Sequence, residues 1–201
     1  MSDLRHGPLS SSTIHLCVDM QKLFSSEGPW PAPWMERVLP TVTRIAERYA
    51  DRTVFTRFIP PEKPEDMPGQ WRAYYEHWRQ ATRAVLDPDL LNLMPSLARL
   101  TPPAAVLDKP VYSPFTGHRL LNLLRSQGTD TLVITGSETD MCVLATALGA
   151  VDHGYRVVLV SDALCSSSDE GHDSLLSLYS KRFSHQIETL DSERLFSEWR
   201  A

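Results

Sequence analysis

Short apolar runs alternate along the chain with longer segments in which apolar residues recur at helical spacing. The runs at 13–19, 52–58, 104–108, 131–135, 155–161 and 186–189 are apolar and mostly rich in β-branched residues, and they predict strands. Helices are predicted over 34–49, 71–86, 120–124, 139–153 and 169–179, with a last helix from Asp191. Because parallel neighbours need crossover helices, this alternation predicts a three-layer α/β/α sandwich with a six-stranded, mostly parallel, Rossmann-like sheet.

The ends and the loops of this pattern suggest how the chain is organised. Residues 1–12 hold a serine run and no apolar core positions, so we expect a flexible N-terminus followed by a single domain over 13–201. Residues 59–70 contain several prolines and a glycine, which disfavour regular structure. A loop of this length beside the end of a strand is a candidate lid.

Composition and charge exclude several classes of partner. The 201 residues are 42% hydrophobic and 22% charged, which is typical of a globular domain. The net charge of −5 leaves no basic excess for nucleic acid, and no apolar run reaches the roughly 18 residues that a membrane helix needs. The three scattered cysteines form neither a disulfide framework nor a Cys-x-x-Cys metal pair, so we expect a cytoplasmic protein.

Reactive side chains lie where predicted strands end. Asp19 ends the first strand, Lys109 follows the third, and Cys142 lies near the start of the helix after the fourth. Ligands of open parallel sheets bind at this edge. A thiol in the first turn of a helix is favoured as thiolate, a carboxylate could accept its proton, and an ammonium would keep that carboxylate ionised. The alternative for Cys142, as for Cys17 and Cys165, is that of a small buried apolar residue.

Three sequence motifs in one order strengthen the catalytic interpretation. They are Val-Asp-Met-Gln at 18–21, Lys-Pro-Val-Tyr-Ser-Pro-Phe at 109–115 and Thr-Gly-Ser-Glu-Thr-Asp-Met-Cys-Val at 135–143. From residue 13 to about 174 the chain resembles the isochorismatase-like cysteine hydrolases, which include nicotinamidases and N-carbamoylsarcosine amidases. The resemblance implies a triad of Asp19, Lys109 and Cys142, with a thioester formed on the cysteine. It also implies a cis peptide between Ser137 and Glu138, and an oxyanion hole made by the backbone N–H groups of Glu138 and Cys142.

The chain departs from these relatives after the second predicted strand. Nicotinamidases of this superfamily bind a metal there through an Asp-x-His motif, but residues 55–61 contain neither a histidine nor a carboxylate. We therefore predict no metal and no cofactor. The Arg57 guanidinium could bind the carboxylate of an anionic substrate, or it could face solvent or pair with Glu62. Gln21, Phe115 and His118 are further predicted substrate contacts.

Aromatic residues of the 71–86 segment have two possible roles. These aromatic side chains could line the substrate pocket, or they could form contacts in the core and between subunits; they are Trp71, Tyr74, Tyr75 and Trp78. The resemblance also implies a homo-oligomer, either a dimer or a tetramer.

The predicted function is metal-independent hydrolysis of a carbon–nitrogen bond in a small linear amide, carbamoyl or ureido substrate. One alternative is isochorismatase-type hydrolysis of a vinyl ether with Asp19 as the acid, and another is a nicotinamidase-like activity. A small-molecule substrate is the expected partner.

Overall fold

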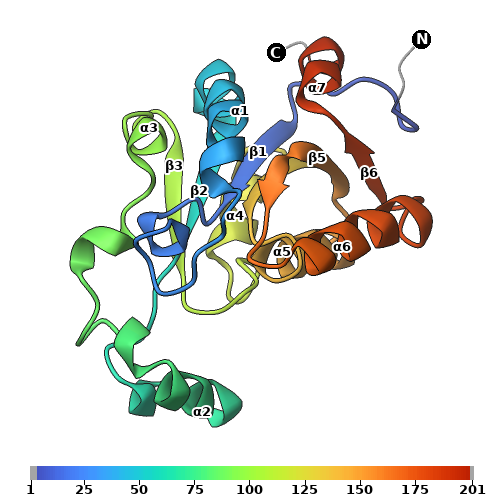
Figure 1. The fold of residues 1–201 in the computed structure, drawn as a ribbon. Coiled ribbons are helices and arrows are strands. Elements are labelled where there is room, and N and C mark those ends of the chain that lie inside the picture. Colours follow the sequence, from blue (N-terminus) through green and yellow to red (C-terminus); the bar gives the residue numbers. More distant parts are fainter. Residues whose placement is uncertain (1–3, 200–201) are drawn as a thin grey trace.

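A six-stranded parallel sheet forms the centre of the computed structural model, which describes residues 4–199. The strands are β1 (Thr13–Val18), β2 (Thr53–Phe58), β3 (Ala105–Lys109), β4 (Thr131–Ser137), β5 (Arg156–Cys165) and β6 (Ile187–Leu190). They are arranged in the order β3-β2-β1-β4-β5-β6, and every neighbouring pair is parallel. The predicted α/β sandwich is confirmed (Figure 1).

Helices cover both faces of this sheet. They are α1 (Met35–Arg48), α2 (Gly69–His77), α3 (Pro95–Ala98), α4 (Arg119–Ser126), α5 (Cys142–Asp152), α6 (Asp169–Lys181) and α7 (Ser192–Glu198). Residues of α1 and α7 pack in one buried apolar cluster, whereas residues of α4, α5 and α6 pack in a second. Successive side chains of β1 alternate between the two: Cys17 belongs to the first cluster, and Leu16 and Val18 to the second. The sheet is therefore buried on both faces.

Two predicted helices differ in length from those observed. The helix predicted over 71–86 ends at His77, and a 3₁₀ turn follows at Arg79–Ala81. The chain then turns back, and the Arg83 N–H donates to the Pro61 carbonyl in the proline-rich loop at 3.0 Å. The helix predicted from Thr139 begins at Cys142 because the Thr139 N–H donates to the carbonyl of Cys165 in β5 at 2.9 Å. This contact leaves Cys142 as the first residue of α5.

The N-terminal segment is packed where we expected a flexible end. Leu4 and Leu9 are buried in the cluster beneath α1 and α7, and the Leu9 N–H donates to the Glu198 carbonyl at 2.9 Å. Arg156 donates to the Gly7 carbonyl at 2.8 Å. Residues 1–3 of the predicted flexible terminus lie outside the described residues.

Helix α2 stands apart from both helical layers. It lies beyond the carboxyl ends of the strands, at the end of an excursion that leaves β2 and returns to β3 (Figure 1). None of the helices found within residues 4–199 is both long and apolar enough to cross a membrane.

Candidate active site

Asp19, Lys109 and Cys142 meet at the carboxyl edge of the sheet. Asp19 follows β1, Lys109 ends β3 and Cys142 begins α5. The Lys109 ammonium reaches past β2 and lies 2.6 Å from Asp19 Oδ2 and 3.4 Å from Cys142 Sγ. The three residues are 0%, 3% and 5% exposed, respectively. The structure thus brings together the three residues that the sequence singled out.

The Asp19 carboxylate is fixed from both sides. Its second oxygen accepts a 2.6 Å hydrogen bond from the Thr56 hydroxyl of β2. Asp19 has a φ of +49°, a left-handed conformation that aspartate tolerates better than most residues, and its N–H donates to the Thr56 carbonyl at 3.2 Å. Thr56 could not be identified from the sequence, because its contact with Asp19 depends on β2 being the neighbour of β1.

Lys109 is held as an ammonium. Burial by itself lowers the pKa of the Lys109 amine, but the charge and the hydrogen bond of Asp19 oppose it, and that pKa is raised above its ordinary value. The ammonium also donates to the Val111 carbonyl at 3.1 Å and lies 5.1 Å from the centre of the Phe58 ring. A stable positive charge therefore lies between the carboxylate and the thiol.

Cys142 is a thiol in the resting protein. Burial and then the charge of Asp19 raise the pKa of Cys142 well above its ordinary value, and the opposing effect of Lys109 is smaller. The expectation that the helix start would favour a thiolate is therefore outweighed by burial, which the sequence does not reveal. The thiol must lose its proton when it attacks a carbonyl carbon, and the adjacent Asp19 can accept it.

Backbone donors are free beside the thiol. The Ser137–Glu138 peptide is cis, as the resemblance implies. The Glu138 carbonyl accepts hydrogen bonds from the N–H groups of Met141 and Val143, at 3.1 and 3.0 Å. Within residues 4–199 the N–H groups of Glu138 and Cys142 donate to no other group. The Glu138 carboxylate accepts from the Ser167 N–H at 3.0 Å and from the Ser167 hydroxyl.

Two of the predicted substrate contacts have partners inside the protein. The Gln21 amide is fully buried; it donates to the carbonyls of Phe58 and Leu91 and accepts from the Phe58 N–H. Arg57 makes a bidentate ion pair with Asp108, the residue opposite it on β3, with N–O distances of 2.7 and 2.8 Å. Both side chains are thus engaged within the protein, and their roles as substrate contacts stay predictions.

The other two predicted substrate contacts are Phe115 and His118. The Phe115 ring is buried and packs 5.3 Å from the ring of His153. His118 is exposed, immediately before α4. The structure thus gives Phe115 a packing role and leaves His118 at the surface.

Aromatic side chains of α2 line a cavity near the site. A cavity of about 330 Å³ is lined by Gln70, Trp71, Tyr74 and Tyr112. The Trp71 ring lies 4.8 Å from that of Tyr112 and 6.5 Å from that of Phe58, the ring that contacts Lys109. This cavity therefore lies near Lys109, and a second cavity, of about 320 Å³, is lined by Lys109 itself.

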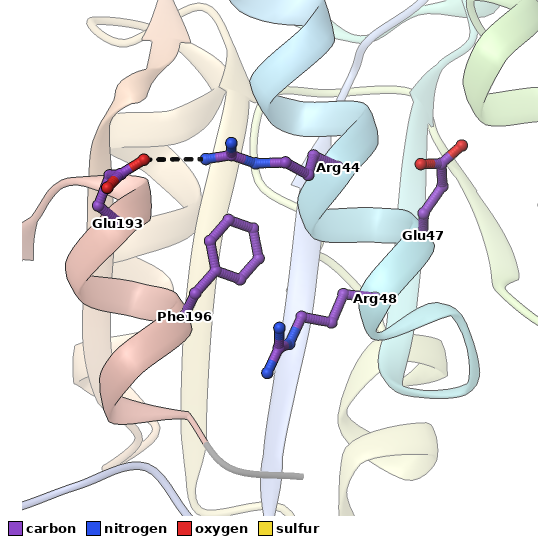
Figure 2. A pocket seen from close by; sticks show the side chains of 5 residues that line it. All are labelled: Arg44, Glu47, Arg48, Glu193 and Phe196. Carbon is purple, nitrogen blue, oxygen red and sulfur yellow. Dashed lines mark ion pairs between the residues drawn. The ribbon is translucent and has the colours of Figure 1, made fainter.

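A larger cavity lies away from the reactive side chains. It measures about 510 Å³ and is lined by residues of α1 and α7, namely Arg44, Glu47, Arg48, Glu193 and Phe196 (Figure 2). Arg44 pairs with Glu193 across it at 3.8 Å. No triad residue lines this cavity, so size alone does not locate the reactive site.

The side chains present do not fit a bound metal. In the part of the chain that the structure describes, no three histidine, cysteine, aspartate or glutamate side chains are grouped closely enough to hold an ion.

Known proteins resemble this chain in both sequence and fold. The isochorismatase domain model matches residues 13–191. A nicotinamidase, Nicotinamidase 3 of Arabidopsis thaliana, is 28% identical over 86% of this chain and 82% of its own. A maleamate amidohydrolase of Pseudomonas putida is 35% identical, but over 35% of this chain and only 33% of its own length. The crystal structure of a cysteine hydrolase from Pseudomonas syringae is 23% identical, with a TM-score of 0.80 over 96% of each chain. The chain therefore belongs to the isochorismatase family of hydrolases.

Proposed function

We propose that this hydrolase cleaves a carbon–nitrogen bond of a small amide, carbamoyl or ureido substrate through a thioester on Cys142. The observation that supports the proposal best is the buried contact of one ammonium, Lys109, with both Asp19 and Cys142, at 2.6 and 3.4 Å. The charge of Lys109 stabilises the carboxylate and, during attack, the developing thiolate. The Lys109 ammonium thus contacts both the acid–base group, Asp19, and the nucleophile, Cys142.

The first half of the reaction transfers the acyl group to sulfur. Cys142 Sγ attacks the carbonyl carbon and forms the carbon–sulfur bond, while its proton passes to Asp19. The carbonyl oxygen becomes an oxyanion, for which the free N–H groups of Glu138 and Cys142 are the proposed donors. The carbon–nitrogen bond then breaks, and protonated Asp19 gives its proton to the leaving nitrogen.

The second half regenerates the enzyme. Asp19 takes a proton from water, whose oxygen attacks the thioester carbon. The carbon–sulfur bond breaks, the sulfur regains a proton from Asp19, and the acid product leaves. Thr56 keeps the Asp19 carboxylate in one orientation through both halves, because its hydroxyl is bonded to the oxygen that does not face Lys109.

A screen for ammonia release tests the proposal. Nicotinamide, an N-carbamoyl amino acid, biuret and ureidoacrylate cover the substrate classes, and nicotinamide comes first because the nicotinamidase relative matches 86% of the chain. We expect the Cys142→Ala protein, folded as judged by circular dichroism, to lose all such activity. Full activity of that variant would refute the proposal. Turnover of isochorismate by the same variant, abolished by Asp19→Asn, would instead favour vinyl-ether hydrolysis.

The oligomeric state and the cellular location stay predictions. Size-exclusion chromatography with light scattering distinguishes the expected dimer or tetramer from a monomer.

A further inference from the structure

The loop at 138–141, between β4 and α5, connects the two proposed oxyanion donors. It begins with the Glu138 N–H and leads to the N–H of Cys142. Inside the loop, the Glu138 carbonyl accepts hydrogen bonds from the N–H groups of Met141 and Val143, which fix the shape of the turn. Bonds within a turn do not fix where the turn lies relative to the sheet. The position of both donors therefore depends on contacts between this loop and other elements.

Thr139 is the residue through which the loop is bonded to its surroundings. It is fully buried, and its N–H and its hydroxyl both donate to the Cys165 carbonyl at the end of β5, at 2.9 and 3.1 Å. The Thr139 carbonyl accepts from the Tyr179 hydroxyl of α6 at 3.3 Å. Thr139 thus connects the loop to β5 and to α6.

His172, near the start of α6, supplies a further bond to Thr139. Its Nδ1 lies 2.8 Å from the Thr139 hydroxyl oxygen. The single hydrogen of that hydroxyl is donated to the Cys165 carbonyl, so the hydrogen between the two side chains belongs to His172, and Nδ1 is the donor. The His172 ring is buried and lies 6.1 Å from the ring of Trp34. This side chain is therefore directed at the loop and not at solvent.

The residues on either side of Thr139 are bonded to the same segment through their carboxylates. Ser167 donates to the Glu138 carboxylate, and the Ser166 hydroxyl donates to that of Asp140. A carboxylate on a flexible side chain can move without moving its backbone. Thr139 differs because its short side chain is bonded together with its own N–H and carbonyl. A contact with the Thr139 hydroxyl therefore acts more directly on the backbone of the loop.

We propose that His172 is a positioning residue for the reaction. It fixes Thr139, and through Thr139 it keeps the N–H groups of Glu138 and Cys142 where the substrate oxygen becomes an oxyanion. This inference rests on the proposed function, which assigns the oxyanion to these two donors. His172 acts through Thr139 and not by contact with the substrate. A displacement of reacting groups by about 1 Å can slow a reaction about 100-fold, so a small movement of the loop would be measurable.

Two reagents that modify the same sulfur distinguish this role from a general one. With p-nitrophenyl acetate, Cys142 Sγ bonds to the carbonyl carbon through an oxyanion, its proton passes to Asp19, the ester carbon–oxygen bond breaks and p-nitrophenolate leaves. Iodoacetamide alkylates the sulfur by displacement of iodide from a saturated carbon, without an oxyanion. Peptide mass spectrometry gives the rate of each modification at Cys142.

We expect His172→Ala to slow acylation of Cys142 by at least about tenfold and to leave its alkylation within about twofold of the wild-type rate. Acylation at the wild-type rate, or an equal decrease in both rates, would overturn the proposal.

Conservative variants test whether the Nδ1 donor is what matters. Asparagine places an amide N–H close to the position of the Nδ1–H of histidine, whereas glutamine places it nearer to that of Nε2. We expect His172→Asn to be acylated within about threefold of the wild-type rate and His172→Gln to be as slow as His172→Ala. Equal rates in the asparagine and glutamine variants would contradict the role assigned to Nδ1.

A double-mutant cycle tests whether His172 acts through Thr139. Thr139→Val removes the oxygen that His172 contacts, so adding His172→Ala to this variant should slow acylation no further. A further decrease in the double variant would show that His172 acts by another route.

The control for destabilisation is Tyr49→Phe. The buried Tyr49 hydroxyl donates to the Trp199 carbonyl at 2.8 Å, and neither residue contacts the loop through that bond. We expect this variant to have a lower melting temperature and an unchanged ratio of acylation to alkylation. A similar fall of that ratio in Tyr49→Phe would show that the effect of His172→Ala follows from lost stability. Absence of acylation at Cys142 in the wild type would refute the proposed function itself, whereas rapid acylation of both the wild type and His172→Ala would refute only the role of His172.

Discussion

A neutral histidine within the sheet makes the stability of the protein depend on pH. His15 of β1 is fully buried between two threonine hydroxyls, 3.1 Å from Thr53 and 2.8 Å from Thr135. Burial lowers its pKa from 6.5 to about 3, so the unfolded chain binds a proton at acidic pH that the folded chain does not. Its contribution to stability is present above pH 6.5 and is lost as the pH falls from there towards 3.

The size of this effect follows from the two pKa values. The free energy of unfolding falls by about 1.4 kcal/mol per pH unit inside the window, which amounts to about 2 kcal/mol between pH 7 and pH 5. Urea denaturation of the wild type and of His15→Asn at both pH values measures it. We expect the decrease to be smaller by that amount in His15→Asn, whereas His118→Asn, which replaces an exposed histidine, should behave like the wild type. An equal decrease in the wild type and His15→Asn would refute the reasoning.

Two further predictions concern the site. Asp19 raises the pKa of Cys142 and Lys109 lowers it, so the pH profile of Cys142 alkylation by iodoacetamide should move to lower pH in Asp19→Asn and to higher pH in Lys109→Met. Shifts of the same sign in both variants would contradict the charge arrangement. Gln21→Leu should lower the free energy of unfolding by about 2 to 4 kcal/mol in urea denaturation, because backbone groups of Phe58 and Leu91 lose their buried partner. Unchanged stability with impaired substrate binding would instead support its predicted role as a substrate contact.

The layers of the fold and the meeting of the three reactive residues could be predicted from the sequence. Alternating strand and helix patterns require parallel strands, and residues that follow parallel strands gather at one edge. This rule predicts that Asp19, Lys109 and Cys142 lie at one edge of the sheet, whereas their grouping as a triad was implied by the resemblance of the motifs, because contact between the side chains depends on the order of the strands.

The partners of individual side chains could not be predicted, because they depend on strand order and register. Arg57 pairs with Asp108 since β2 and β3 are neighbours with those two residues in register. Thr56 reaches Asp19 since β2 also borders β1. Burial was equally hidden, and it is the largest cause of the raised pKa of Cys142.

The central claim is that Cys142 carries the acyl group during turnover. Rapid acid quenching of the enzyme with an amide that it hydrolyses, followed by intact-protein and peptide mass spectrometry, tests this claim directly. We predict a mass increase equal to the acyl group, located on the peptide that contains Cys142 and absent from Cys142→Ala. Steady-state hydrolysis at the wild-type rate by folded Cys142→Ala protein, with no acylated peptide, would contradict it.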